Sequence, residues 1–343
     1  MCKEVMLHVG LRLYYGRKSC KIDIKIMKRE QETEMEQQSF AYEETEQGIR
    51  ILRCYGRSSR VEIPERIDGR PVIELAAYAF AKDMEEEPEN TSGMPCICGD
   101  NLEELYLPKT IVRLGRYIFY NCIQFRKFSF YSNIAFMGAG AFTGCERLSC
   151  LYMHEVIEEK SCLREILADL KQAVQVKVYE EAECRYELVY PEFFEEAEEN
   201  TPARIINTVT HGMGIQYRNA FRNTRVIFSE YDKLFETGKY NIDLINAVGL
   251  AIGRLVYPIE LEEMSRKSYE KFLTEHLQQA AEILLEQKEM QKLRWLAEQF
   301  IAQKEQMEVL TAVAVKQEDT EVISMLLDIR HHRFPERKKK FSL

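Results

Sequence analysis

The residues that could carry chemistry are the histidines, the cysteines and one glycine-rich segment. None of the six histidines occurs in a His-x-x-x-His or His-Glu-x-x-His spacing; they are His8, His154, His211, His276, His331 and His332. Those spacings would place two imidazoles on one helix face, where they could bind zinc. The histidines therefore predict no catalytic residue, no metal ligand and no cofactor site.

The segment His211-Gly212-Met213-Gly214 is the best candidate for a small-ligand site. Two glycines beside a histidine could form a phosphate-binding loop or an oxyanion hole. The segment matches neither the Walker pattern nor the dinucleotide fingerprint, and no nearby serine or cysteine has the context of a nucleophile. We interpret it as a turn between two elements. A ligand-binding, nucleotide-binding or enzymatic site at His211, Gly212, Gly214 and Arg218 stays open as the alternative.

Ten cysteines are scattered along the chain rather than grouped at paired spacings. The N-terminus lacks the features of a secretion signal, so we expect a cytoplasmic protein with free thiols. Cys122 and Cys145 are expected to be small buried residues. Cys96-Ile97-Cys98 is weak evidence for a metal, because no second pair completes a zinc ligand set.

A repeat with a period of 23 residues must position several of these cysteines. Several sets of positions are equivalent in one register: Leu102, Phe125 and Leu148; Leu105, Phe128 and Leu151; Gly115 and Gly138; Phe119 and Phe142; Cys122 and Cys145. This self-similarity predicts a solenoid of stacked short strands. Leu105, Phe128 and Leu151 should form one buried column, and the glycines should mark tight turns.

The repeat resembles the BspA-like type of leucine-rich repeat found in bacteria. The shared features are a Leu-x-x-Leu-x-Leu-Pro strand at Leu102, an Ala-Phe-x-x-Cys segment at Ala141, and the opening turn Ile67-Asp68-Gly69-Arg70-Pro71-Val72. The likeness covers roughly 48–153; Ile118 replaces the usual alanine, Ala76 replaces the usual glycine, and 84–100 interrupts the array. The resemblance implies a leucine-rich-repeat solenoid that binds proteins. A later block, Tyr190–Asn219, resembles a segment of Firmicutes repeat proteins and implies no activity.

The remaining segments predict a mixed unit around the solenoid. Residues 1–40 have no clear structure, with alternation at 7–15 and 22–27, and Met27 could be the true start. We expect a first solenoid strand at 40–54. In 156–241, a mixed α/β cap, we expect a helix at 162–171, a hairpin of strands 174–179 and 186–190, and a helix beginning at Thr201-Pro202.

The C-terminal part predicts helices. Apolar residues fill 242–257 up to Pro258, and 262–286 has apolar residues at three- and four-residue steps. A second repeat of about 30 residues places 277–297 over 307–327, each copy a helix, a short polar turn and a helix. The run beginning at Asp319 resembles the second helix of an ankyrin-type unit. Residues 242–330 are therefore expected to be an ankyrin-like array, followed by a basic tail at 331–343.

Composition favours protein partners over nucleic acid or membrane. The net charge is −9, and only the end of the chain is basic, so the acidic body disfavours nucleic acid. No apolar run approaches the length of a membrane span. The sequence thus predicts an α+β fold: a short leucine-rich-repeat β-solenoid at 41–155, a mixed capping segment and a C-terminal helical-hairpin array.

The preferred function is a non-enzymatic scaffold that binds a protein of unknown identity. The partner would contact the solvent-facing strand positions of the repeats, Glu104, Tyr106, Lys127, Ser129 and Tyr152. Tyrosine offers a large contact area at low entropic cost. A second alternative is a surface adhesin exported without a visible signal. The oligomeric state does not follow from the sequence.

Overall fold

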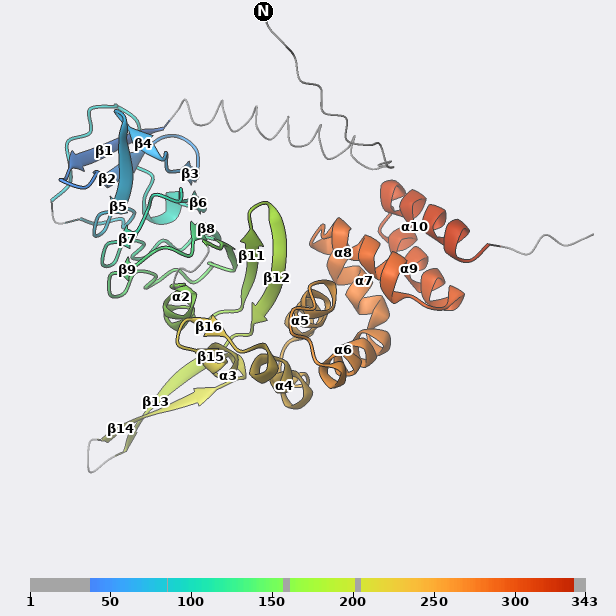
Figure 1. The fold of residues 1–343 in the computed structure, drawn as a ribbon. Coiled ribbons are helices and arrows are strands. Elements are labelled where there is room, and N and C mark those ends of the chain that lie inside the picture. Colours follow the sequence, from blue (N-terminus) through green and yellow to red (C-terminus); the bar gives the residue numbers. More distant parts are fainter. Residues whose placement is uncertain (1–37, 85, 157–160, 201–204, 336–343) are drawn as a thin grey trace, which may run out of the picture.

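A computed structural model describes residues 38–84, 86–156, 161–200 and 205–335 of the chain. The fold is α+β: a β-solenoid, a mixed segment that closes its end, and a C-terminal group of helices (Figure 1). The short strands expected at 7–15 and 22–27 lie outside the described residues.

Parallel strands form the main sheet of the solenoid. These are β3 (Arg60–Glu62), β6 (Glu104–Tyr106), β8 (Lys127–Tyr131) and β10 (Cys150–His154). The register pairs Leu105 with Phe128 and Phe128 with Leu151, and none of the three is exposed. Val61 of β3 precedes them in the same column. The buried column expected from the 23-residue period is therefore confirmed.

A second sheet closes the other side of the solenoid. Its order is β1 (Ser39–Glu44), β2 (Ile49–Tyr55), β5 (Arg70–Leu75), β7 (Arg113–Leu114) and β9 (Phe136–Met137), with β4 (Arg66–Ile67) paired to β5. The single strand expected at 40–54 is wrong. β1 and β2 are antiparallel, because a turn closed by Thr45 N–H donating to Gly48 O, at 2.8 Å, divides the segment.

Phenylalanines and cysteines fill the interior between the sheets. Phe119 stacks on Phe80 and Phe142, with ring centroids 5.6 and 5.1 Å apart. The Cys122 and Cys145 thiols donate to the carbonyls of Phe80 and Phe119, each at 3.2 Å, from buried positions. Both cysteines are thus small core residues, as expected, and the described cysteines are free thiols.

The repeat glycines serve close packing rather than the tight turns expected. A Cβ on Gly115 would lie 2.2 Å from the Ala77 nitrogen, and one on Gly138 would lie 2.2 Å from the Arg116 nitrogen. Neither glycine has a positive φ. The left-handed turn position falls instead on Tyr78, Tyr117 and Gly140, at φ 60°, 49° and 64°.

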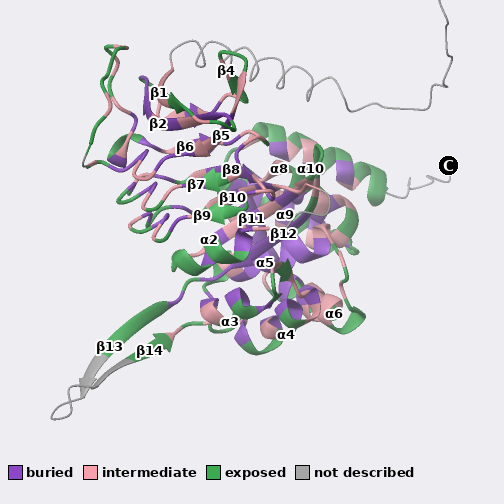
Figure 2. Cartoon of the chain, turned by 60° about the vertical axis from the view of Figure 1, so that its left-hand side comes forward, coloured by how far each residue is buried: buried purple, intermediate pink, exposed green. Residues whose placement is uncertain are grey.

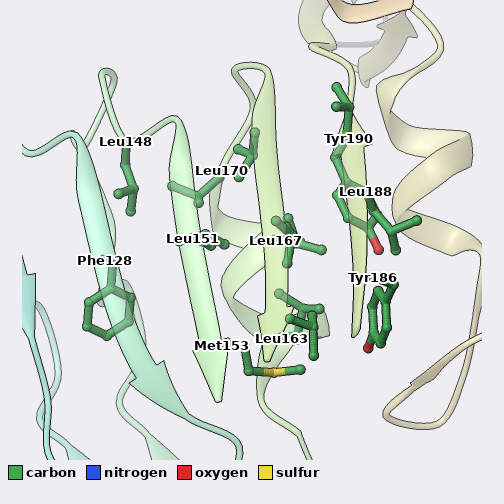
Figure 3. Close-up of a cluster of buried hydrophobic side chains, with 14 of the residues drawn as sticks. Phe128, Leu148, Leu151, Met153, Leu163, Leu167, Leu170, Tyr186, Leu188 and Tyr190 are labelled. Carbon is green, nitrogen blue, oxygen red and sulfur yellow. The ribbon is translucent and has the colours of Figure 1, made fainter. Parts of the chain in front are cut away.

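A helix and a hairpin close the end of the solenoid. Helix α2 (Leu163–Asp169) links β10 to β11 (Val174–Glu180), which continues the main sheet in parallel, and β12 (Glu183–Tyr190) adds an antiparallel strand. Leu163, Leu167 and Leu170 pack over the inner face of these strands (Figure 3). The expected helix and hairpin are confirmed, and they cover the open end of the solenoid.

A two-stranded arm follows the closing hairpin. β13 (Phe194–Asn200) and β14 (Ile205–His211) pair antiparallel and extend away from the body (Figure 2). Thr201 and Pro202, where a helix was expected to begin, lie outside the described residues, and the chain from Ile205 to His211 is a strand. Three small elements follow, and they return the chain to the body: α3 (Gly214–Asn219), β15 (Phe221–Arg222) and β16 (Arg225–Val226).

Helices make up the rest of the described chain. α4 (Phe228–Gly238) and α5 (Leu244–Val256) lead into α6 (Glu263–Glu275), α7 (Leu277–Glu286), α8 (Met290–Trp295) with a π-helical turn at Leu296–Phe300, α9 (Lys304–Lys316) and α10 (Thr320–Arg333). The segment 262–286 is helical, as its spacing predicts, and the backbone at His276 divides it into α6 and α7. The two helical hairpins expected from the 30-residue repeat are confirmed as α7–α8 and α9–α10.

Two smaller points concern the ends of the helices. α10 continues to Arg333, so the first residues of the basic tail expected at 331–343 are helical. Its N-cap is Asp319, whose carboxylate accepts from Val322 N–H at 3.0 Å.

Within the described residues, no helix has both the length and the apolar character needed to span a membrane.

Candidate protein-binding surface

The five residues expected to contact a partner lie on one face of three adjacent strands. In the register, Glu104 is opposite Lys127, and Tyr106, Ser129 and Tyr152 follow one another across β6, β8 and β10. They alternate with the buried column, so their side chains point away from the core. We call this side of β3, β6, β8, β10 and β11 the outward face.

Hydrogen bonds fix the acidic end of the outward face. The Lys127 ammonium lies 3.0 Å from Glu104 Oε1, and the Tyr106 hydroxyl donates to Glu104 Oε2 at 2.7 Å. Burial works to raise the pKa of Glu104, but these two hydrogen bonds outweigh it and leave the pKa below its usual value. The Glu104 side chain is therefore an ionised carboxylate that hydrogen bonds hold in place. Its hydrogen bond with the Tyr106 hydroxyl orients the Tyr106 ring.

Cations lie over both tyrosine rings. The Arg60 guanidinium is 4.4 Å from the centre of the Tyr106 ring, and the Lys127 ammonium is 5.9 Å from the centre of the Tyr152 ring. Such contacts stabilise by about 0.5–1 kcal/mol at exposed sites. They reduce the rotamer freedom of the rings, so less entropy remains to be lost when a partner binds.

Ser129 departs from its expected exposure, because only 6% of it is accessible. It sits between Tyr106 and Tyr152 in the register, and these larger neighbours cover it. Its hydroxyl lies 3.2 Å from His154 Nε2. A serine–histidine pair could suggest a nucleophile and base, but no carboxylate among the described residues hydrogen-bonds the other imidazole nitrogen. The pair therefore lacks the third group that orients a catalytic base.

An aromatic stack at the edge of this face was not anticipated. The His154 ring lies between Tyr131 and Tyr179, with centroid distances of 4.9 and 5.4 Å. These residues are directly opposite one another on β8, β10 and β11. Burial lowers the pKa of His154. The 23-residue spacing of Tyr131 and His154 could have predicted that these two rings stack. Tyr179 could not be predicted in the same way, because helix α2 precedes β11 and interrupts the spacing.

The helices cover the far end of the same face. On β12, Glu187 accepts from the Lys292 ammonium of α8 at 2.5 Å and from the Gln175 amide at 2.7 Å, and it is 1% exposed. Lys177 of β11 lies 3.0 Å from Glu289, which precedes α8. This buried ionic group attaches the helical array to the last strands. The outward face is thus bordered by α8 on one side.

The candidate site around His211 has a structural role instead. Arg218 is buried, and its guanidinium donates to carbonyls of five residues: Leu167, Leu170, Pro191, Gly214 and Gln172. The His211 ring stacks on Phe194 at 4.8 Å, at the base of the arm. Gly212 takes a φ of 90°, and Gly214 begins α3, so the segment is a turn between two elements. Arg218 is consequently committed to the fold and cannot reach a ligand phosphate.

A cavity of about 380 Å³ lies between the end of the solenoid and β15–β16. Arg185 lines it and is already paired with Glu155 at 2.6 Å and with Glu180 at 3.8 Å. Across the described residues, no cluster of three histidine, cysteine, aspartate or glutamate side chains could hold a metal ion.

Comparison with known proteins identifies the repeat. Residues 93–164 match a family model described as BspA type leucine rich repeat region. No functionally curated protein matches the chain. The matched residues contain β6, β8 and β10, so this part of the outward face lies on leucine-rich repeats.

Two solved structures are similar to part of the chain. A leucine-rich repeat protein from T. pallidum shares 24% identity over 33% of this chain and 50% of its own, with a TM-score of 0.27. A leucine rich cell surface protein from Faecalibacterium prausnitzii A2-165 shares 16% identity over 36% of this chain and 39% of its own, with a TM-score of 0.24. The chain thus spans half or less of the length of these neighbours.

Proposed function

We propose that this chain is a non-enzymatic scaffold whose outward face binds a protein partner. The observation that supports this most is the set of ordered tyrosines and charges on three adjacent strands, Tyr106, Tyr152, Glu104 and Lys127. They stay partly exposed on a rigid sheet whose opposite side is the solenoid core. Aromatic residues flanked by charges are typical of the anchors that contribute most to protein interfaces.

A protein fits this face better than nucleic acid or a small molecule. Its cations are already paired, Lys127 with Glu104 and Lys177 with Glu289, so they offer little free positive charge to phosphates. The face is an extended sheet surface rather than a cavity that could enclose a small ligand. Repeat proteins commonly use such surfaces for extended partners.

We propose that the segments predicted from the sequence have separate roles. The solenoid of residues 41–155 would supply most of the outward face, residues 156–241 would close the end of the solenoid, and the array of 242–330 would border the outward face. An ankyrin-like array at 242–330 and a cytoplasmic location are part of this proposal. Fractionation of the source cells tests the location, because a surface adhesin would be recovered outside the cytosol.

The test is affinity capture from a lysate of the source organism with the full chain as bait. Tyr152→Ala should reduce recovery of the partner by about tenfold or more, because loss of a buried anchor costs roughly 1–2 kcal/mol or more. Tyr240→Ala is the matched control, since this tyrosine is 76% exposed on the loop between α4 and α5. Equal capture by the wild type and Tyr152→Ala would show that the partner binds elsewhere.

A further inference from the structure

The segment Cys96–Gly99 is fixed against the first turn of the solenoid. Gly56 N–H donates to Pro95 O at 3.0 Å and Ile97 N–H donates to Cys54 O at 2.9 Å, so the segment runs along β2. Gly99 N–H donates to Phe80 O at 2.9 Å. These bonds hold both sides of a Cys-x-Cys pair.

The two thiols lie on the same side of this segment. Cys96 pairs with Tyr55 in an antiparallel bridge, and Cys98 has an extended backbone, with φ −151° and ψ 162°. Ile97 between them is 1% exposed, so alternation turns both thiols to the opposite, partly exposed side.

The spacing of the pair is close to that of a disulfide. Two residues of extended chain span roughly 6.6 Å between Cα atoms, and disulfides bridge Cα separations of about 4.4–6.8 Å. The Cα spacing therefore lies at the upper end of the range that a disulfide bridges, and bond formation requires the backbone to contract and to turn the two Cβ atoms toward each other. Being near the upper limit, such a disulfide would be more easily reduced than a structural disulfide.

A buried cation, Arg53, lies on β2, the strand that the cysteine segment runs along. Arg53 is 0% exposed, and its Nη1 donates to Ala81 O at 2.6 Å and, more weakly, to the carbonyls of Tyr78 and Ala79. Its Nε and Nη2 have no hydrogen-bond partner among the described residues. Nη2 lies 3.5 Å from the carboxylate of Glu87, which is 58% exposed. A buried guanidinium with unpaired donors favours a negative charge nearby.

These surroundings give the Cys98 thiol a lower pKa than the other described thiols. Interaction with the Cys96 thiol, together with the charge of Arg53, lowers the pKa of Cys98 to about 7, against the effects of burial and of the Glu87 and Asp83 carboxylates. Burial raises the pKa of the described cysteines outside this pair. Thiolate character and partial exposure are the features of a redox-sensitive cysteine.

We propose that Cys96 and Cys98 form a redox site, which a hydroperoxide oxidises to an intramolecular disulfide and a dithiol reductant restores. The Cys98 thiolate attacks a peroxide oxygen, the O–O bond breaks, and the leaving oxygen takes a proton, giving a sulfenic acid and water or an alcohol. Cys96 then loses its proton and attacks the Cys98 sulfur. The S–O bond breaks and the hydroxide leaves as water. Two electrons pass from the thiols to the peroxide.

Alkylation of the full chain by iodoacetamide measures the reactivity of each thiol. Peptide mass spectrometry should show Cys98 reacting with a midpoint near pH 7, as its pKa of about 7 requires. At pH 7 a thiol with pKa 7 should react about five- to eightfold faster than one with pKa 9, after allowing for its lower intrinsic nucleophilicity. Cys150 and Cys184 are the internal references, since both are partly exposed. A Cys98 midpoint matching theirs would overturn the proposal.

Treatment with hydrogen peroxide tests the disulfide itself. The wild type should lose two hydrogens within the peptide that carries Cys96 and Cys98, and dithiothreitol should restore them. Cys96→Ser should instead leave a sulfenic acid on Cys98 that dimedone traps. A wild type that accumulates sulfinic acid at Cys98, links two chains, or does not oxidise would refute the intramolecular site.

One exposed variant tests the role of charge without disturbing the core. Glu87→Gln removes the carboxylate that opposes the thiolate, so Cys98 should react faster at pH 7 and its midpoint should fall. Glu89→Gln is the matched control, because Glu89 is exposed in the same insertion and does not act on the pair. If Glu87→Gln slows Cys98 or leaves it unchanged, the electrostatic part of the proposal is wrong.

Discussion

Replacing Gly138 with alanine tests the stacking of the solenoid turns directly. The new Cβ would lie 2.2 Å from the Arg116 nitrogen, 2.5 Å from Arg116 Cα and 2.6 Å from Gly115 C. All three are backbone atoms of the preceding turn, so no side chain can move aside. Carbon atoms in ordinary contact are about 3.5–4.0 Å apart. The two turns must therefore separate by about 1 Å or more.

The energetic cost follows from what this separation disrupts. Gly138 N–H donates to Leu114 O at 2.9 Å, and Tyr117 N–H donates to Ala139 O at 3.1 Å. Weakening two such bonds costs about 1–3 kcal/mol in total, and overpacking a filled interior costs a further 1–3 kcal/mol, approximately. We expect Gly138→Ala to destabilise the solenoid by about 2–6 kcal/mol.

Gly69→Ala is the matched control. Gly69 has a φ of 79°, but nothing lies within 4 Å of its added Cβ. Gly69→Ala should therefore lower the free energy of unfolding only by the cost of placing an alanine in the left-handed conformation, about 1–2 kcal/mol. Comparison of the two variants separates backbone strain from collision between turns.

Hydrogen exchange by mass spectrometry is the appropriate assay. Trp295, the only tryptophan, lies in α8, so its fluorescence reports the helices rather than the solenoid. Amides of β6, β8 and β10 should exchange faster in Gly138→Ala, by a factor of roughly 30 or more for 2 kcal/mol. If Gly138→Ala matches Gly69→Ala or the wild type, the turns do not approach as closely as described here.

Two further predictions concern charged groups. Lys292→Met should destabilise the contact between β12 and α8 by up to about 3–5 kcal/mol, because it leaves the buried Glu187 carboxylate with only the Lys177 ammonium, 4.0 Å away. The double variant with Glu187→Leu should recover much of this loss in urea unfolding followed by Trp295 fluorescence. His154 has a lowered pKa in the folded state, so the unfolded chain binds the proton more readily, and stability should fall as the pH drops below the unfolded pKa of about 6.5. His154→Asn should reduce that fall between pH 7.5 and 5.5, and an unchanged slope would contradict the assignment.

The sequence alone predicted the solenoid because its core is periodic. Leu105, Phe128 and Leu151 recur every 23 residues, and neighbouring turns can bury them only by stacking in register. The same logic predicted the outward face, since alternate residues of a strand point to opposite sides. The helical hairpins of the C-terminal part follow from the 30-residue repeat in the same way.

Features that depend on contacts between distant segments could not be predicted. Ser129 is buried because Tyr106 and Tyr152 of neighbouring strands cover it. Arg218 looked available for a ligand, but the chain folds so that its guanidinium meets the carbonyls of Leu167 and Leu170, about fifty residues earlier. A local sequence pattern contains no information about contacts between segments that are far apart in the chain.

The sequence by itself therefore determined the repeating architecture and which strand positions face outward. Only the tertiary structure decided why Gly115 and Gly138 must be glycines and how the segment of Cys96 and Cys98 comes to run along β2, the strand that carries Arg53. The physical reason is the distance along the chain over which each feature is determined. Periodic burial is encoded within each turn, whereas close backbone approach and buried charge are properties of segments brought together by folding.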